Sequence, residues 1–393
     1  METIKQRFAV PFTYDVHFTR GLFVPDNNTF FKAIQALSDQ PMAKIFFVVD
    51  DGVLKNHPQL INQIKAYFSH HKEYLRLVAE PLVVPGGEQV KNSNRHVEDI
   101  LAKVDVQGID RHSYIAIIGG GAVLDMGCYA ATIAHRGIRQ IRIPTTVLSQ
   151  NDSGIGVKNG INAFGKKNFL GCFSPPHLVL NDLNFLHTLD DRDWRAGISE
   201  AVKVALIKDK TFFQWIRDHA SALAQRDDAP MEKLIHQCAK MHMDHIAGGD
   251  PFEMGSSRPL DFGHWAAHKL EQVTDYQLRH GEAVATGIAL DTIYSFQQGM
   301  ITEAACHEVL GTFFDLGFDL FVPELEKENE LTGKLLVIEG LEEFREHLGG
   351  KLTIMLLAEI GHGIEVHLMD HIQIQKAIDY LKAWQPAFEK SKI

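Results

Sequence analysis

The first half of the chain alternates short apolar runs with amphipathic stretches. Between the apolar runs, residues 58–71 and 94–104 repeat apolar positions every three or four residues, as the buried face of a helix does. Strands that alternate with helices are typical of a parallel sheet covered by helices. We therefore predict an α/β domain of Rossmann-like type over residues 1–188. Its buried strands are expected at residues 44–50, 75–85, 113–121 and 138–146.

From about Asp190 the pattern changes to successive amphipathic helices. Strand signals are few in this half, apart from residues 351–360 and 363–369. We predict that residues 189–393 form a second, mainly α-helical domain. Its helices are expected at residues 192–209, 231–248, 262–274 and 281–299.

Composition narrows the class of protein. A chain of 393 residues is long enough for two domains, and 45% hydrophobic with 23% charged residues is ordinary for a globular protein. The net charge of -11 argues against a nucleic-acid groove or an anionic membrane surface as partner. The four cysteines are scattered, and neither a signal peptide nor an apolar run of about 18 residues is visible. We therefore expect a cytoplasmic protein with reduced thiols.

A glycine-rich turn follows the expected strand at residues 113–121. Gly119, Gly120 and Gly121 lead into a helical stretch that carries Asp125 in its first turn. Glycines at this place let the backbone approach a phosphate, and a helix N-terminus favours negative charge. The same glycines also suit a plain tight turn, because they tolerate positive φ. The turn alone is compatible with both interpretations.

Three histidines and one glutamate stand out in the second half. His264 and His268 are four residues apart and lie on one face of the predicted helix, and His280 follows closely. Glu200 is an acid within an otherwise apolar helix, where a buried carboxylate needs a partner. A metal would supply that partner, as would an ion pair with Lys203 three residues on. The spacing leaves both interpretations open, and a single histidine on such a helix is more often structural.

A polar stretch, residues 144–171, connects the two patterns. It is too polar to belong to a core, so it is either an exposed surface loop or a lining for a small phosphorylated, polyhydroxylated ligand. Its charged and amide groups include Asp152, Lys158, Asn162, Lys166, Lys167 and Asn168.

Taken together, these stretches resemble the 3-dehydroquinate synthases and the wider sugar phosphate cyclase family. The resemblance covers about residues 50–291, in the family's order. It rests on "PGGEQVK", "GGGAVLD", "AHRGI", "IPTTVLSQNDSGIGVKNGIN", "GKKNFLG", "RAGISEAVKVALI", "LDFGHWAAHKLE" and "RHGEAVATG".

The resemblance implies a reaction without net redox change on a phosphorylated seven-carbon sugar. A secondary alcohol is oxidised with NAD+, phosphate is eliminated, the ketone is reduced again, and ring opening with an intramolecular aldol step closes a carbocycle. Zinc, with cobalt as an alternative, polarises the alcohol that is oxidised. The family's metal ligands fall on Glu200, His264 and His280.

Other positions of the family's site can be matched in the same way. His268 matches the general acid/base histidine, Lys203 a lysine that contacts substrate near the metal, and Asp152 an active-site aspartate. Arg136 matches an arginine that reaches the neighbouring subunit's site, which implies a homodimer. The remaining matched substrate-binding positions are Lys158, Lys167, Asn168, Lys240 and Glu253. The matched NAD contacts are Asp50, Glu88, Lys91, Gly120, Gly121, Asp125, Thr145 and Thr146.

Some substrate positions depart from the 3-dehydroquinate synthase pattern. Asp261 replaces an asparagine, and Ser257 stands where an arginine is usual, with Arg258 one residue later. We count Arg258 and Asp261 among the substrate-binding residues. An aspartate at position 261 resembles the pattern of the sedoheptulose 7-phosphate cyclases, such as 2-epi-5-epi-valiolone synthase. Those enzymes, however, usually lack a histidine at the position of His268. The substrate therefore stays open between the two classes.

Two further classes stay as alternatives. A metal-dependent alcohol dehydrogenase of the glycerol dehydrogenase type shares the glycine turn and the two-domain layout, but it usually begins its metal site with an aspartate. A non-catalytic relative is disfavoured because Glu200, His264, His280, Lys203 and His268 are all present.

Overall fold

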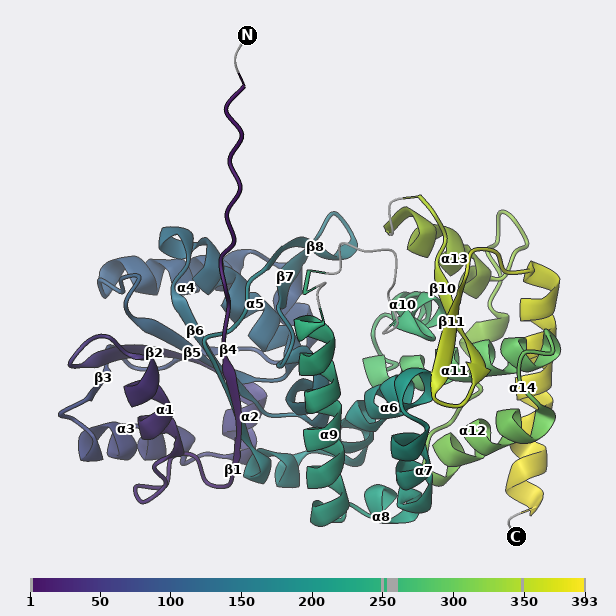
Figure 1. The fold of residues 1–393 in the computed structure, drawn as a ribbon, viewed down its shortest axis with the longest axis horizontal. Coiled ribbons are helices and arrows are strands. Elements are labelled where there is room, and N and C mark those ends of the chain that lie inside the picture. Colours follow the sequence, from purple (N-terminus) through teal and green to yellow (C-terminus); the bar gives the residue numbers. More distant parts are fainter. Residues whose placement is uncertain (1–2, 249–250, 253–260, 348–349, 392–393) are drawn as a thin grey trace. The chain divides into compact units, whose positions relative to one another are not determined.

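The computed structural model of the chain describes residues 3–248, 251–252, 261–347 and 350–391. The chain forms two compact units (Figure 1). The first comprises residues 1–145 and 156–185, and the second comprises residues 146–155 and 186–393. Glu253, Ser257 and Arg258, which the sequence singled out, lie outside the described residues.

The first unit is built on a parallel sheet. Its path runs β1-β9-β6-β5-β2-β3, with β4 also paired to β2, and every pairing is parallel. The expected strand at residues 75–85 is two short strands, β3 and β4, each paired with a different part of β2. The strands are β1 (Asp15–Thr19), β2 (Ala43–Asp50), β3 (Leu75–Leu77), β4 (Leu82–Val84), β5 (Tyr114–Gly119), β6 (Arg139–Pro144) and β9 (Leu178–Asp182).

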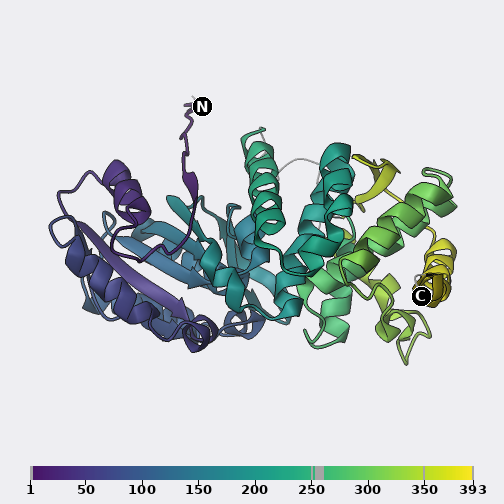
Figure 2. The ribbon, with the colours of Figure 1, turned by 90° about the horizontal axis from the view of Figure 1, so that it is seen from below.

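The sheet is apolar on both faces because helices cover both, as Figure 2 shows from a second direction. Along β2, Phe47 and Val49 belong to one core cluster, whereas Phe46 and Val48 belong to the other. This alternation follows from the two-residue period of a strand. It also explains why these strands read as continuous apolar runs in the sequence.

Helices α1 and α3 pack on one face, and α4 and α5 pack on the other. The polar stretch contains a β-hairpin in this unit, so the surface-loop interpretation was wrong for residues 158–173. Polar side chains concealed these strands, and five of the eight positions of β8 are exposed. The remaining elements are α1 (Thr29–Leu37), α2 (Asp51–Asn56), α3 (Leu60–His70), η1 (Glu88–Asn92), α4 (Arg95–Val106), α5 (Gly121–Ile133), η2 (Ala134–Arg136), β7 (Lys158–Ala163) and β8 (Lys166–Phe173).

The second unit is mainly helical, with a short antiparallel hairpin. Helix α11 lies at its centre, in contact with α6, α10, α12 and α14. None of the helices in the described part of the chain combines the length and the apolar character that a membrane crossing needs. The elements are η3 (Ser149–Ser153), α6 (Asp191–Lys208), α7 (Lys210–Asp218), α8 (Ala220–Ala224), α9 (Asp228–Ala247), α10 (His264–Val273), α11 (His280–Gln297), α12 (Glu303–Asp315), η6 (Pro323–Glu326), α13 (Leu336–His347), β10 (Ile354–Glu359), β11 (His362–Val366) and α14 (His371–Ser391).

The fold class predicted from the sequence is confirmed: a Rossmann-like parallel sheet is followed by a mainly helical part.

Candidate functional site

Three helices of the second unit meet at unusually short distances. A Cβ added to Gly281 at the start of α11 would lie 2.0 Å from the carbonyl oxygen of Ala196 in α6. A Cβ added to Gly287 would lie 2.0 Å from the carbonyl oxygen of Gly263, which directly precedes α10. Since no side chain fits at these contacts, the glycines allow α6, α10 and α11 to approach. Each of these helices contributes one of the predicted metal ligands.

Glu200, His264 and His280 converge in the structure. One ligand atom from each lies within 4.8 Å of the other two. Oε1 of Glu200 is 3.5 Å from Nε2 of His280 and 3.8 Å from Nε2 of His264. Glu200 and His264 are buried, and the side chain of His280 is 26% exposed.

Hydrogen bonds at the far side of each imidazole fix its orientation. Nδ1 of His264 donates to the carbonyl oxygen of Phe262 at 3.1 Å. Nδ1 of His280 donates to Oε2 of Glu271 at 3.2 Å, and the Glu271 side chain is only 5% exposed. Both rings therefore direct Nε2 toward Glu200. Such outer carboxylate and carbonyl partners are typical of histidine ligands in metal sites.

The protonation states of the cluster suit metal binding. Burial acts to raise the pKa of Glu200, but the positive charge of Lys203 and the hydrogen bond from His280 outweigh it and lower the pKa to about 2. Burial, followed by the positive charge of Lys203, lowers the pKa of His264 well below its ordinary value. Glu200 is thus an anion and His264 a neutral imidazole, which are the forms that bind metals.

The geometry fits a divalent ion. A tetrahedral zinc with ligand distances of about 2.1 Å holds its ligand atoms about 3.4 Å apart. The two separations between the carboxylate oxygen and the imidazole nitrogens, 3.5 and 3.8 Å, are close to that spacing. One carboxylate with two imidazoles is a common set of three protein ligands for a catalytic zinc, which keeps a further position open.

Lys203 and His268 lie beside these ligands. Lys203 is 4% exposed and forms an ion pair with Oε2 of Glu200. Burial acts to lower the pKa of Lys203, but the charges of Glu200, Asp152 and then Asp261 raise it overall, so the group is an ammonium ion. The ring of His268 lies 5.4 Å from that of His264 and 6.2 Å from that of His280, measured between centroids.

Asp152 is placed in the same unit by η3, which packs against α6 and α9. Its Oδ1 accepts a hydrogen bond of 2.7 Å from Nδ1 of His242 in α9. Burial acts to raise the pKa of Asp152, but the His242 charge lowers it overall. Lys240, the residue of α9 expected at the substrate, has a 59% exposed side chain and pairs with Asp244 at 2.6 Å. The structure therefore brings His242, rather than Lys240, to Asp152.

In the first unit, the glycine turn joins β5 to α5. The N–H of Leu124 bonds the carbonyl of Gly120, and the N–H of Thr145 bonds that of Gly119. A Cβ on Gly119 would lie 2.8 Å from Cβ of Val123 and 3.1 Å from Cβ of Asp50. The turn is therefore tightly packed between strand and helix. Asp50 ends β2 beside it, and burial raises the pKa of Asp50.

Several of the predicted NAD contacts form one polar network. Nζ of Lys91, which is 2% exposed, donates to Oδ2 of Asp125 at 2.8 Å and also to Oδ1 of Asn168. Glu88 lies 3.6 Å from the same ammonium and accepts from Asn162 at 3.2 Å. Burial raises the pKa of Asp125, against the lowering effect of Lys91. Asn168, which the resemblance matched to a substrate-binding position, thus contacts Lys91, which it matched to an NAD contact.

The other predicted residues are described by their elements and exposure. Lys158 is exposed at the start of β7, Lys167 is half-buried in β8, and Arg136 is exposed in η2 with a positive φ of 64°. The side chain of Thr146 lies in the second unit, with its Oγ1 2.9 Å from Oγ of Ser149. Gly121 begins α5.

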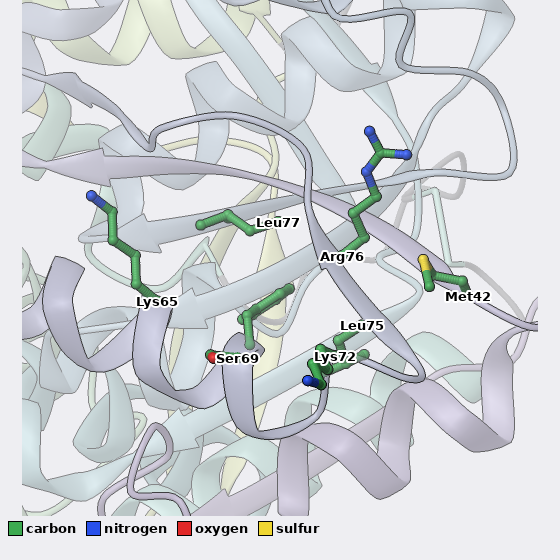
Figure 3. Close-up of a pocket in the computed structure, with 8 residues that line it drawn as sticks. Met42, Lys65, Ser69, Lys72, Leu75, Arg76 and Leu77 are labelled. Carbon is green, nitrogen blue, oxygen red and sulfur yellow. The ribbon is translucent and has the colours of Figure 1, made fainter.

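A surface hollow in the first unit lies between α3 and β3. Figure 3 shows Lys65, Lys72 and Arg76 around an apolar floor that includes Leu75 and Leu77. Lys65 is already paired with Glu80 at 2.8 Å. None of the residues singled out from the sequence lines this hollow.

Reasoning from sequence missed three residues that shape the metal centre. Glu271 is seven residues after His264, and that spacing places both on one helix face. Asp291 is an acid within the apolar run of α11, the same signal that drew attention to Glu200. His242 lies four residues after the buried Cys238 of α9, but the several histidines of that helix concealed it.

Comparison with known proteins assigns the family. Residues 81–196 match the model of the 3-dehydroquinate synthase N-terminal region, and residues 197–334 match that of the C-terminal region. The chain belongs to the 3-dehydroquinate synthase family. It is accordingly an enzyme of the cyclase type, and the resemblance noted in the sequence is confirmed.

Individual relatives agree with this assignment. A 3-dehydroquinate synthase of Nitrosospira multiformis is 34% identical over 305 residues, which cover 77% of this chain and 80% of the relative. One of Geobacillus kaustophilus is 32% identical over 361 residues, or 91% of each chain. The structure of ValA, a 2-epi-5-epi-valiolone synthase of Streptomyces hygroscopicus with NAD+ and Zn2+ bound, is 27% identical, with a TM-score of 0.84 over 97% of this chain and 99% of its own.

Proposed function

We propose that this enzyme is an NAD+- and divalent-metal-dependent sugar phosphate cyclase, a lyase that eliminates phosphate from a phosphorylated seven-carbon sugar and closes a carbocycle. The observation that carries the proposal is the convergence of Glu200, His264 and His280 beside the buried ammonium of Lys203. A metal-polarised alcohol next to a fixed positive charge suits a reaction in which negative charge develops on oxygen.

The cofactors are supported by the donor sets of the two units. A zinc or cobalt ion held by Glu200, His264 and His280 would supply a Lewis acid for a substrate hydroxyl. NAD+ would supply a reversible hydride acceptor. ValA, at 27% identity, holds NAD+ and Zn2+. In this chain the nucleotide would lie along the glycine turn after β5, with Asp50, Glu88, Lys91, Gly120, Gly121, Asp125, Thr145 and Thr146 as its contacts.

The side chains around the metal centre have separate tasks in this proposal. Lys203 provides a permanent charge that binds and orients substrate oxygen. His268 lies next to both proposed histidine ligands without belonging to the converging set, and we propose that its imidazole moves a proton to or from the sugar. Asp152 orients a substrate hydroxyl through its carboxylate. Lys158 and Lys167 are proposed to bind the phosphate group, and Arg136 to complete the site of a partner subunit in a homodimer.

Two substrates separate the possibilities within the family. We expect the purified, metal-loaded enzyme with NAD+ to release inorganic phosphate from 3-deoxy-arabino-heptulosonate 7-phosphate or from sedoheptulose 7-phosphate. Release from the first identifies a 3-dehydroquinate synthase, and release from the second alone identifies a valiolone-type cyclase that retains His268.

The absorbance of NADH, followed in the same reaction, distinguishes this proposal from an alcohol dehydrogenase. A cyclase regenerates NAD+ in each turnover, so phosphate accumulates without a matching rise in NADH. Steady accumulation of NADH without phosphate release would contradict the proposal.

A further inference from the structure

Helix α9 presents an imidazole, and not an ammonium group, to Asp152. His242 and Lys240 are two residues apart, which separates their side chains by about 200° around the helix. His242 reaches Asp152, and its side chain is 16% exposed. Lys240 is 59% exposed and is bound one turn along by Asp244. Bringing Lys240 to Asp152 would require α9 to rotate by nearly half a turn.

The contact between Asp152 and His242 belongs to the surroundings of the metal ligands. Asp152 is close enough to Glu200 and Lys203 that the charges of both act on it. Cys238 lies one turn before His242 on the same face of α9 and is buried. Burial and the charges of Asp152 and Glu200 raise the pKa of its thiol, and the charge of Lys203 acts to lower it. The face of α9 that carries His242 is therefore the face directed at the site.

The pair of His242 and Asp152 carries no net positive charge in either protonation state of the imidazole. With a protonated imidazole, His242 and Asp152 sum to zero, and with a neutral imidazole they sum to -1. In neither state does the pair offer a net positive charge to a ligand. An ammonium group at this place would favour a carboxylate, whereas Asp152 repels a carboxylate beside it. The Lys203 ammonium also acts on Asp152, but it is paired with the Glu200 carboxylate.

We infer that His242, held by Asp152, is a specificity-determining residue that binds a hydroxyl-bearing, uncharged part of the sugar phosphate and disfavours a carboxylate there. The inference rests on the proposed function for the nature of the ligand. Nδ1 of His242 is used by Asp152, which leaves Nε2 as the ring nitrogen for a substrate hydroxyl. A hydroxyl both donates and accepts, so it can bond Nε2 in either protonation state.

Binding is measured separately from turnover to test this inference. The holoenzyme is loaded with metal and with NADH, which cannot begin the oxidation, and the two sugar phosphates are titrated calorimetrically. Sedoheptulose 7-phosphate carries a hydroxymethyl group where 3-deoxy-arabino-heptulosonate 7-phosphate carries a carboxylate. We expect the former to bind at least about tenfold more tightly, and His242→Ala to weaken its binding about tenfold or more.

Lys240→Ala is the matched control, because it removes an exposed side chain from the same helix. It is expected to leave both affinities unchanged, while His242→Gln, which keeps one hydrogen-bonding group, retains part of the affinity. Metal content and melting temperature are measured for each variant to recognise a misfolded protein. If His242→Ala is misfolded, the affinities of His242→Gln decide the test.

Three results would overturn the inference: equal or tighter binding of the carboxylate sugar, a loss of affinity in Lys240→Ala but not in His242→Ala, or no binding of either sugar by wild-type holoenzyme. Failure of the proposed function has a different signature, which is the absence of phosphate release with NAD+ even when a sugar binds.

Discussion

We expect Asp291 to stabilise the segment that carries the proposed ligand His264, with an effect that depends strongly on pH. Its side chain is buried in the middle of α11. Oδ1 accepts from Nε1 of Trp265 at 2.8 Å, and Oδ2 accepts from the N–H of Gly263 at 2.9 Å. The two donors flank His264 in the sequence. One carboxylate thus holds the start of α10 from both sides.

Burial of this carboxylate has a calculable consequence. Burial raises the pKa of Asp291 from 3.8 to about 7, although the two hydrogen bonds act to lower it. The folded state therefore holds this proton at a higher pH than the unfolded state does. The stabilisation is complete below the unfolded pKa and is lost as the pH rises through the folded value. Each pH unit within that window costs about 1.4 kcal/mol of unfolding free energy.

The perturbation is Asp291→Asn. An amide offers one acceptor for two donors, and its NH2 group then faces an N–H, so at about pH 5.5 the variant should be destabilised by about 1–3 kcal/mol. Wild type loses about 2 kcal/mol between about pH 5.5 and 8.5 from ionisation of Asp291, whereas the variant has no such group. The difference in unfolding free energy between the two proteins should therefore shrink by about 2 kcal/mol across this range.

Urea unfolding of the metal-free proteins, followed by tryptophan fluorescence at several pH values, measures this difference. Other titrating groups are common to both proteins and cancel in the comparison. Asp244→Asn is the matched control, because Asp244 is exposed on α9 and its removal should give a difference independent of pH. A pH-independent difference for Asp291→Asn as well would refute the reasoning, since Asp291 would then be ionised throughout the range.

Four further predictions concern the metal centre. Glu200→Ala or His264→Ala should abolish stoichiometric zinc binding and turnover, as measured by elemental analysis and phosphate release, because three protein ligands leave none to spare. His268→Ala should keep its zinc but lose rate by about 100-fold or more in the same assays, and loss of zinc would make His268 a ligand. Glu271→Gln should weaken zinc binding about 10–100-fold in a chelator competition, because the His280 ring loses its carboxylate partner. Gly287→Ala should separate α11 from α10, lower the melting temperature and reduce zinc content, whereas Gly299→Ala, where a Cβ meets no neighbouring atom, tests whether backbone strain alone has that effect.

The parallel sheet and the helical half were predictable because each has a distinct pattern of apolar residues in the sequence. Continuous apolar runs such as residues 44–50 indicate strands that are buried on both faces, and the structure places alternate residues of β2 in two cores. The hairpin of β7 and β8 could not be recognised in this way. Its two strands pair with each other, and their lysine, asparagine and glycine residues interrupt the apolar alternation that identifies a strand.

The direction of a side chain around a helix was the harder property to predict. Spacing correctly predicted that His264 and His268 share a helix face. The family resemblance matched Lys240 to a substrate-binding position, whereas the structure brings His242 to Asp152 and leaves the Lys240 side chain 59% exposed. A phase difference of two residues exchanges the buried and exposed faces of a helix. The buried apolar positions of α9, such as Ile235 and Cys238, continue to His242 and not to Lys240.

The acids that orient the ligands follow a single physical rule that the sequence does display. Glu200 and Asp291 each interrupt an apolar helix, where an unpaired carboxylate would cost several kcal/mol. The chain can retain such an acid only if other groups converge on it: at Glu200 they are Lys203 and two imidazoles, and at Asp291 they are the donors on either side of His264. A buried acid in an apolar helix therefore predicts a meeting point of segments that are distant in sequence. Asp291 in α11 therefore predicts a contact with a distant segment, as Glu200 does in α6. In the structure, the segment that contacts Asp291 is the start of α10.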